Sequence, residues 1–463
     1  MEKTNTVPQE NKMGVMDVNK LLLTMSVPMM VSMLVQALYN VVDSIFVSKI
    51  DEYALTAVSL AFPMQSLMIA LAVGTGVGVN ALLSKRLGEK RFLEAKIVAN
   101  ISVLIAFVEY LVFCILGAVF SGSFFAMQTE IPEIVSYGTS YMTICTTLSF
   151  GMFGQMCMER LLQATGRTVC SMCTQLFGAV INIIFDPILI FGLLGFSKMG
   201  IAGAAAATVA GQICAMILAF VLNCRLNEEV SFRISLMKPN LAVIKEIFAV
   251  GVPSILMQSI GSLMVFLMNK ILMGFTSTAA AVFGVYFKLQ SFVFMPVFGL
   301  NNGLIPIVAY NYGAGHRDRI KKAMRYGATY AVLIMFVGLL LAEMIPGPLL
   351  KLFDASDNML EIGIPAIRII CISFVFAGFA IVASGVFQGL GKSIYSLYVS
   401  VARQLVVLIP VAYLLSLTGN LNWVWLSFPI AEIASILITL WGLRRVMRHL
   451  DECLKEGASS CEG

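Results

Sequence analysis

The sequence predicts an all-α polytopic membrane protein with twelve transmembrane helices. These form two six-helix bundles related by a pseudo-twofold axis along the membrane normal. Three observations lead to this prediction. Of the 463 residues, 59% are hydrophobic and 12% are charged, against roughly 25% charged residues in an ordinary soluble domain. The apolar residues fall in long runs, and the first half of the chain aligns with the second.

Twelve apolar runs, each near or above the length of about 18 residues that marks a membrane helix, are the predicted helices. They cover residues 20–46, 54–83, 95–119, 134–155, 168–192, 200–222, 246–273, 278–306, 322–346, 361–384, 394–417 and 421–443. The ten cysteines are scattered, mostly within these runs, so no disulfide framework is predicted.

Basic residues set the predicted orientation. The terminal tails and the even-numbered loops hold 24 of the 31 Lys and Arg residues, whereas the odd-numbered loops hold Lys49, Lys198 and Lys351. Because cytoplasmic loops carry the excess of Lys and Arg, both termini are expected in the cytoplasm of a plasma-membrane protein. The net charge of +5 therefore reports membrane topology and does not predict a nucleic-acid partner.

An internal repeat divides the chain. With an offset of 225 residues, several positions of the two halves match: Val27-Pro28 with Val252-Pro253, Gly74 with Gly299, Gly78 with Gly303, Gly88 with Gly313 and Gln163 with Gln388. The predicted units are an N-terminal lobe of residues 1–222, a cytoplasmic linker of 223–245 and a C-terminal lobe of 246–463. Parallel repeats of this kind commonly build alternating-access transporters, with the substrate site between the halves.

The stretch INIIFDPILIFG, residues 181–192, combines an amide, a carboxylate and a proline within an apolar run. Asn182 and Asp186 are four residues apart and share one helix face, and Gln175 extends the stripe. Pro187 cannot donate to the carbonyl of Ile183, so a kink with a free backbone oxygen is expected beside the carboxylate. Such oxygens suit a proton or a small hard cation.

A second stripe occurs in the first predicted helix, where Ser32, Gln36, Asn40 and Asp43 are spaced four, four and three apart. Thr208 and Gln212 repeat the spacing of four in the sixth helix. Polar side chains can simply join helices to one another. For Asp43 and Asp186 a functional role is favoured, because carboxylates facing lipid are costly and should face each other or a wet cavity.

The second half repeats the architecture but not this chemistry, since Asp43 and Asp186 align with Met268 and Val411. Arg403 and Glu432 lie at comparable depth in neighbouring helices, and we expect a structural ion pair there, with a substrate contact as the alternative. The roles of Glu109, Lys288 and Glu343 stay open.

At this point the sequence resembles the multidrug and toxic compound extrusion (MATE) transporters, and in particular their bacterial multidrug exporters. The motifs that carry the resemblance are SVPMMVSMLVQALYNVVDSIFVS, GTGVGVNALLSKRLGEK, LLQATGRT, NIIFDPILIFG, GIAGAAAATVAGQ and IPIVAYNYGAG. They extend over nearly the whole chain.

The resemblance implies a V-shaped pair of six-helix bundles that exports organic cations in exchange for H⁺ or Na⁺, with no other cofactor. It implies a cation-coupling site at Asp43, Asn182, Asp186 and Thr208, which could hold Na⁺ through the first three. Other members place acidic residues in helices 7 and 10. This chain has none in helix 7 or in the core of helix 10, which puts a sodium site in the second half in doubt.

A substrate cavity is expected next to this site, lined by Gln36, Tyr39, Asn40, Tyr141 and Gln175. The 28 Met and 31 Phe residues suit a cavity that accepts flat apolar cations, although ordinary membrane packing explains them equally well. The expected partners are the lipid bilayer and small organic cations, with one chain sufficient for function. Two alternatives are a lipid-linked oligosaccharide flippase, which would need clustered Arg or Lys for a diphosphate, and a membrane enzyme, for which no reactive constellation is visible.

Overall fold

A computed structural model describes residues 11–353 and 355–456, and it is helical almost throughout. The first half forms α1 (Lys12–Val15), α2 (Val18–Ser48), α3 (Glu52–Gly88), α4 (Phe92–Ala126), α5 (Pro132–Thr147), α6 (Phe150–Ala164), α7 (Thr168–Phe191) and α8 (Ile201–Leu226). After the short helix η1 (Ile234–Leu236), the second half forms α9 (Leu241–Met273), α10 (Ser277–Gly313), α11 (Arg317–Met344), α12 (Pro346–Lys351), α13 (Asp357–Cys371), α14 (Phe374–Gly389), α15 (Ile394–Val401), η2 (Ala402–Leu408), α16 (Ile409–Ser416), α17 (Leu421–Trp425) and α18 (Ser427–Glu456).

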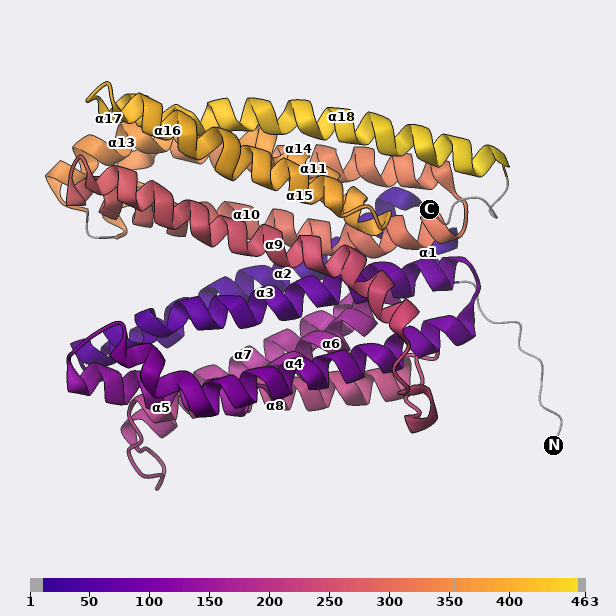
Figure 1. The fold of residues 1–463 in the computed structure, drawn as a ribbon, viewed down its shortest axis with the longest axis horizontal. Coiled ribbons are helices and arrows are strands. Elements are labelled where there is room, and N and C mark those ends of the chain that lie inside the picture. The colour runs from indigo at the N-terminus through magenta and orange to yellow at the C-terminus, as the bar shows by residue number, and fades with distance from the viewer. Residues whose placement is uncertain (1–10, 354, 457–463) are drawn as a thin grey trace.

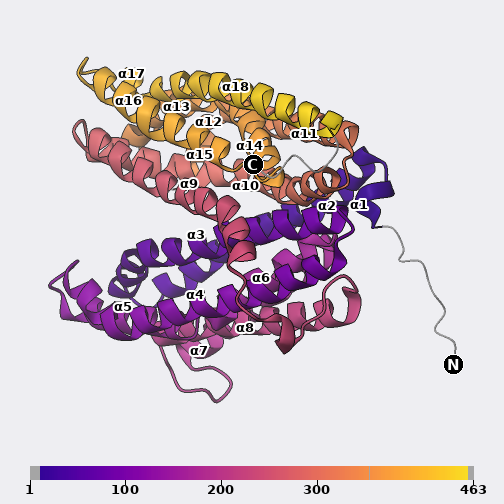
Figure 2. The ribbon, with the colours of Figure 1, turned by 45° about the vertical axis from the view of Figure 1, so that its right-hand side comes forward.

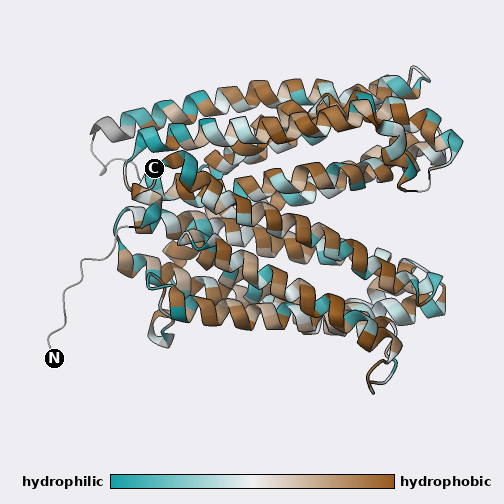
Figure 3. Ribbon diagram, turned by 180° about the vertical axis from the view of Figure 1, so that it is seen from behind, coloured by the Kyte–Doolittle hydropathy of each residue, from teal (hydrophilic) through white to brown (hydrophobic). Residues whose placement is uncertain are grey.

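Two lobes of helices lie one above the other in Figures 1 and 2, with α2–α8 in one and α9–α18 in the other. Their ribbons meet at the end of the molecule where α1 lies and α18 ends, here called the terminal end, and spread apart toward the opposite end. Hydrophobic residues run along the helices, and many hydrophilic ones gather toward the ends (Figure 3). The predicted all-helical, two-lobe membrane fold is confirmed, while the residue limits of the lobes stay a prediction.

Among the described residues, ten helical segments are long and apolar enough to cross a membrane, one of them the continuous stretch of α15, η2 and α16. The pair α13 and α14 makes an eleventh span that bends by 48°. The fourth predicted helix corresponds to α5 and α6, which are each shorter than 18 residues. Its predicted end at residue 155 is wrong, because α6 continues to Ala164. The apolar run stops early because this last part carries Glu159, Arg160 and Gln163, which are buried.

The internal repeat is visible in the turns of the backbone. Asp51 caps α3 by accepting from the amide of Ala54, and Thr276, 225 positions later, caps α10 by accepting from Ala279. The loops before α7 and α15 both contain a glycine with positive φ, 84° at Gly166 and 74° at Gly391. Equivalent loops therefore begin and end equivalent helices in the two halves.

Glycines that the repeat relates to one another line the contact between the lobes. A Cβ on Gly78 of α3 would lie 2.1 Å from the backbone oxygen of Ile247 in α9, and one on Gly303 of α10 would lie 2.8 Å from the Cα of Ser26 in α2. A Cβ on Gly88 would lie 2.0 Å from the backbone oxygen of Tyr310. The lobes thus meet backbone to backbone, as small residues allow between membrane helices.

Polar contacts also join the lobes at the terminal end. Arg86 of α3 is 8% exposed, and its Nη2 lies 2.8 Å from Glu246 Oε2 of α9. The segment around α1 contacts both lobes. Asn11 Nδ2 donates to the backbone oxygen of Thr165 at 3.3 Å on one side, and Arg319 Nη2 donates to the backbone oxygen of Met16 at 2.7 Å on the other. The terminal end is therefore closed by packing, an ion pair and hydrogen bonds.

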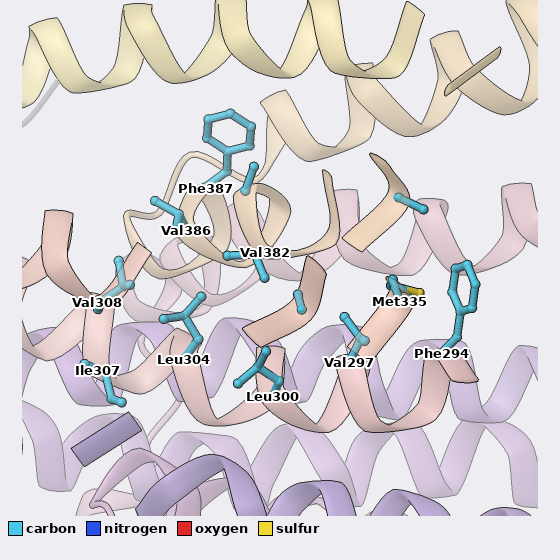
Figure 4. Packing of buried hydrophobic residues seen from close by; sticks show 14 of the residues in the cluster. Phe294, Val297, Leu300, Leu304, Ile307, Val308, Met335, Val382, Val386 and Phe387 are labelled. Carbon is cyan, nitrogen blue, oxygen red and sulfur yellow. The ribbon is translucent and has the colours of Figure 1, made fainter. Parts of the chain in front are cut away.

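The core of the C-terminal lobe is apolar. Figure 4 shows Leu300 and Leu304 of α10 beside Val382, Val386 and Phe387 of α14. All five side chains are at most 1% exposed. This lobe therefore offers a rigid surface to the contact between the lobes, because close-packed cores resist deformation.

Candidate functional site

The polar stripes predicted for the first, fifth and sixth transmembrane helices meet in the N-terminal lobe. Asp186 and Asn182 of α7 are 0% and 3% exposed. The carboxyl group of Asp43 in α2 lies close enough to that of Asp186 for the two to interact. In the orientation that satisfies both neighbours, the Asn182 amide donates to Asp186 Oδ2 at 3.2 Å and accepts from the backbone nitrogen of Thr208 at 3.2 Å. The structure thus brings together the four residues expected to couple transport to a cation.

Close packing of α7 against α8 positions this group. A Cβ on Gly211 of α8 would lie 2.7 Å from the backbone oxygen of Gly178 and 3.2 Å from the Cβ of Asn182. Near the other end of α7, a Cβ on Gly203 would lie 2.6 Å from the backbone of Leu189. Because both helices carry glycine at the crossing, the Thr208 backbone can reach the Asn182 side chain.

Two carboxylate oxygens of the site accept no hydrogen bond from a described residue. Asp43 Oδ1 and Asp186 Oδ1 are both buried and accept no hydrogen bond from any described residue. Two carboxylates this close repel each other unless a proton or a cation lies between them. The donor set is made of carboxylate, amide and hydroxyl oxygens, which fits H⁺ or Na⁺. Among the described residues no cluster of three His, Cys, Asp or Glu side chains forms a transition-metal site.

A cavity of about 80 Å³ leads away from this group between α2, α6, α7 and α8. All of its polar lining residues are uncharged, namely Ser32, Gln36, Tyr39, Gln155, Gln175, Asn182, Thr208 and Gln212. Drug-sized ligands occupy pockets of about 300–1,000 Å³, so in this conformation the cavity has room for an ion and water only.

The residues predicted to line a substrate cavity divide into two groups. Gln36, Tyr39 and Gln175 line the cavity. Asn40 is exposed on α2, and Tyr141 of α5 is 3% exposed and accepts from Gln65 Nε2 at 3.1 Å. These last two do not line the cavity, and a substrate contact for them stays a prediction.

Sequence reasoning missed Glu159 and Arg160, which it left in a loop. They are 1% and 4% exposed in α6, and Glu159 accepts from Gln155, which lines the cavity. The signal that could have found them is the spacing of four between Gln155 and Glu159, which continues the helical face beyond the apolar run.

In the C-terminal lobe, Arg403 Nη1 lies 3.4 Å from Glu432 Oε2. Arg403 belongs to η2, a π-helical segment that ends just before Pro410, whose missing N–H interrupts regular α-helical bonding. Glu432 is 5% exposed and its Oε1 accepts no bond from a described residue. The two side chains meet as expected, and a structural role for the pair stays a prediction.

The pair can be tested by a double-mutant cycle. Removing one partner of a buried pair costs roughly 3–5 kcal/mol, and the partial exposure of Arg403 places this pair at the low end. Arg403→Met or Glu432→Gln alone should lower the melting temperature in detergent, and the double variant should recover much of the loss. If Glu432 contacts substrate instead, Glu432→Gln should weaken dye binding without a stability change, and the double variant should show no rescue.

The three groups left open are placed as follows. Glu109 of α4 is 7% exposed and accepts from Thr75 Oγ1 at 2.6 Å. Glu343 and Arg368 form an ion pair of 3.7 Å between partly exposed side chains. The ammonium group of Lys288 lies 5.8 Å from the centre of the Phe353 ring. None of these groups lines the cavity.

Two related helical lobes that meet at one end, and a buried polar cavity within one of them, define the class of alternating-access membrane transporters. Comparison with known proteins narrows the class. The MatE family model matches residues 28–188 and again residues 253–414, so the two matches begin 225 residues apart. The chain therefore belongs to the MatE family, the MATE transporters.

Curated relatives agree with this assignment. The multidrug export protein MepA of Staphylococcus haemolyticus is 25% identical over 425 residues, covering 91% of this chain and 92% of MepA. An FAD transporter of Shewanella oneidensis is 26% identical over 423 residues, covering 90% of this chain and 92% of the relative.

Solved structures extend the similarity to the whole fold. A multidrug resistance MATE family transporter in an outward-facing conformation has a TM-score of 0.89 and 25% identity, and the match covers 96% of this chain and 99% of that one. A transporter from Pyrococcus furiosus, described as having a binding pocket of reversed polarity, has a TM-score of 0.89 and 26% identity with the same coverage.

Proposed function

We propose that this protein is a secondary antiporter that exports amphipathic, often cationic compounds in exchange for H⁺ or Na⁺. The observation that carries this proposal is the pair of buried, unpartnered oxygens on Asp43 and Asp186. A buried unpaired carboxylate is costly, so the site has a strong reason to take up a proton or a cation. Asn182 and Thr208 supply further oxygens for Na⁺.

Coupling requires that the ion bind the two conformations with different affinity. An ion that enters from outside binds at Asp43 and Asp186 and favours the conformation that releases the exported compound. When the lobes rearrange, the cavity beside Asn182 changes its access to water, and the ion leaves on the other side.

The orientation follows from charge and packing. The terminal end carries the basic loops, so we place it in the cytoplasm, with both termini on that side. The lobes are in contact there and spread apart at the opposite end, which corresponds to an outward-facing state. The similarity to a transporter solved in an outward-facing conformation supports the outward-facing state.

Small organic cations are the proposed cargo, because relatives carry the name multidrug export protein and the cavity joins a carboxylate site. The cavity is too small for a drug in this state, so we place the cargo between the lobes, where the exposed Asn40 becomes a candidate contact, and Tyr141 becomes one only if α5 moves. One chain supplies both lobes, so we expect a monomer to be sufficient for transport in the lipid bilayer of the plasma membrane.

The flippase alternative receives no support from the cavity, because its lining residues include no Lys or Arg that could hold a diphosphate. A membrane enzyme would have to change its substrate chemically. Transport of a dye that leaves the protein unaltered separates the antiporter from both alternatives.

The test is ethidium transport by the purified protein in proteoliposomes, with a pH gradient and a sodium gradient imposed separately. Transport that responds to at least one gradient, in the direction opposite to the ion flow, is the expected result. Equal transport with and without each gradient would overturn antiport, and the comparison of the two gradients identifies the coupling ion.

Pro187 offers a further prediction. The structure keeps α7 as one helix through Pro187, so the proline does not end the helix, and the predicted kink stays a prediction. Pro187→Ala should allow a hydrogen bond to the carbonyl of Ile183 and straighten α7. Dye efflux is expected to fall while expression holds or rises. Efflux equal to wild type would mean that the proline takes no part in transport.

A further inference from the structure

Glu159 is a second buried carboxylate of the N-terminal lobe. Its Oε1 accepts from Gln155 Nε2 at 2.9 Å and from Thr174 Oγ1 at 3.0 Å, and its Oε2 accepts from Gln175 Nε2 at 2.7 Å. The side chain is 1% exposed. All three donors are neutral side chains, so the charged form is well solvated by the protein.

The side-chain amides of two glutamines lie between the Glu159 carboxylate and the cavity beside Asp186. Gln155 and Gln175 line that cavity together with Asn182 and Thr208. Since Gln175 lies two helical turns before Asn182 on α7, the cavity has a carboxylate near each of its ends. Water in the cavity can therefore carry a proton between the two regions.

The surroundings of Glu159 can also hold the protonated acid. Thr174 Oγ1 lies 2.7 Å from the backbone oxygen of Ser171, so its hydroxyl can donate there and accept from a protonated Glu159. Gln175 Oε1 is buried and accepts no bond from a described residue, so rotation of this amide supplies a second acceptor. A sodium ion would meet hydrogen-bond donors here and too few oxygens, whereas a proton is accommodated.

We propose that Glu159 is a proton-exchanging group of this transporter, separate from the site at Asp43 and Asp186. A hydronium ion in the cavity gives its proton to Oε1 of the carboxylate and becomes water, and the reverse step returns the proton to water. The part that this proton plays in transport rests on the proposed antiport function, whereas the exchange itself does not.

Arg160 connects the charge of Glu159 to the contact between the lobes. It is 4% exposed, and its Nη1 donates to Gln163 Oε1 at 3.0 Å and to Asn302 Oδ1 of α10 at 3.3 Å. Arg160 directly follows Glu159 in α6, so the two opposite charges attract each other. The helices that pack against α6 are α3, α4, α7, α8 and α10. Within the described residues, none of them forms an ion pair with Glu159, and α7 contacts it through the neutral side chains of Thr174 and Gln175. Protonation removes the negative charge nearest to Arg160, which favours a state where water reaches this buried cation.

Infrared difference spectroscopy on the purified protein in detergent, without any transported compound, tests the exchange. The protein is taken from alkaline to acid pH, and the carboxylic acid C=O band is compared among variants. Glu159→Gln should lose one component of this band, and Asp186→Asn should keep that component. Glu109→Gln is the matched control, since it removes another buried glutamate and should also keep the component.

A Glu159→Gln spectrum identical to that of wild type would overturn the proposal. If this variant does not fold, Thr174→Val serves instead, because it keeps the carboxyl group and removes one of its hydrogen-bond partners. The component should then shift in frequency, and an unshifted band would also overturn the proposal. The assay needs no transport, so failure of the antiport function would leave this result readable.

Discussion

Asp186→Asn is expected to abolish efflux that is driven by an imposed ion gradient, while the protein still inserts into the membrane. Asparagine keeps the size of the side chain and can keep the contact with Asn182, but it cannot carry a charge. The single carboxylate of Asp43 then makes a poorer site for a proton or a cation. We expect the gradient-driven rate to fall at least about tenfold, which corresponds to about 1.4 kcal/mol.

The measurement is ethidium efflux from proteoliposomes under each gradient, together with dye binding to the purified variant. Asp43→Asn should act in the same direction. Asp318→Asn is the matched control, because Asp318 is exposed at the start of α11 and should leave efflux unchanged. Wild-type efflux in Asp186→Asn would remove Asp186 from the coupling site, and loss of dye binding alone would make it a substrate contact.

Gly78→Ala is expected to prevent the closed contact at the terminal end. The new Cβ would lie 2.1 Å from the backbone oxygen of Ile247, and backbone in a packed interface cannot give way by the required distance. Overpacking of this kind typically costs about 1–3 kcal/mol. We expect the closed state to become rare and dye efflux to fall about tenfold or more, because the cycle requires that contact to form.

Gly284→Ala is the matched control for this change. Gly284 lies in α10, and a Cβ there would meet no atom within 4 Å. Alanine favours a helix over glycine by about 0.5–1 kcal/mol, so this variant should keep efflux and gain slightly in stability. Labelling of a cysteine placed at the terminal end should increase in Gly78→Ala only. Full efflux with unchanged labelling in Gly78→Ala would show that the contact between the lobes tolerates a side chain at this position.

Much of the candidate coupling site could be predicted from the spacing of polar residues alone. Asn182 and Asp186 share a helix face because four residues make about one turn, and the same rule places Gln36 and Asn40 on one face of α2. The spacing could not predict which face of α2 packs against which face of the neighbouring helices. Gln36 lines the cavity whereas Asn40 is exposed, since the turn of α2 and the packing of its neighbours decide this, not the residue type.

The end of the fourth predicted helix was the clearest error, and its cause is physical. A hydropathy window stops where polar residues begin, on the assumption that polar side chains lie in water. Glu159 and Arg160 are buried instead. Glu159 accepts hydrogen bonds from Gln155, Thr174 and Gln175. Arg160 donates hydrogen bonds to Gln163 and Asn302. Asn302 lies 142 residues away in the other lobe, so no local pattern could reveal it.

The sequence by itself determined the membrane class, the internal repeat, the family and the candidate residues for a cation site, because each depends on composition, periodicity or a local motif. The tertiary structure alone decided which polar groups are buried together and which oxygens stay unpartnered. It also decided that Gly78, Gly88 and Gly303 lie in the close contact between the two lobes. These features depend on distances between segments far apart in the chain, and such distances are set by how whole helices pack against one another.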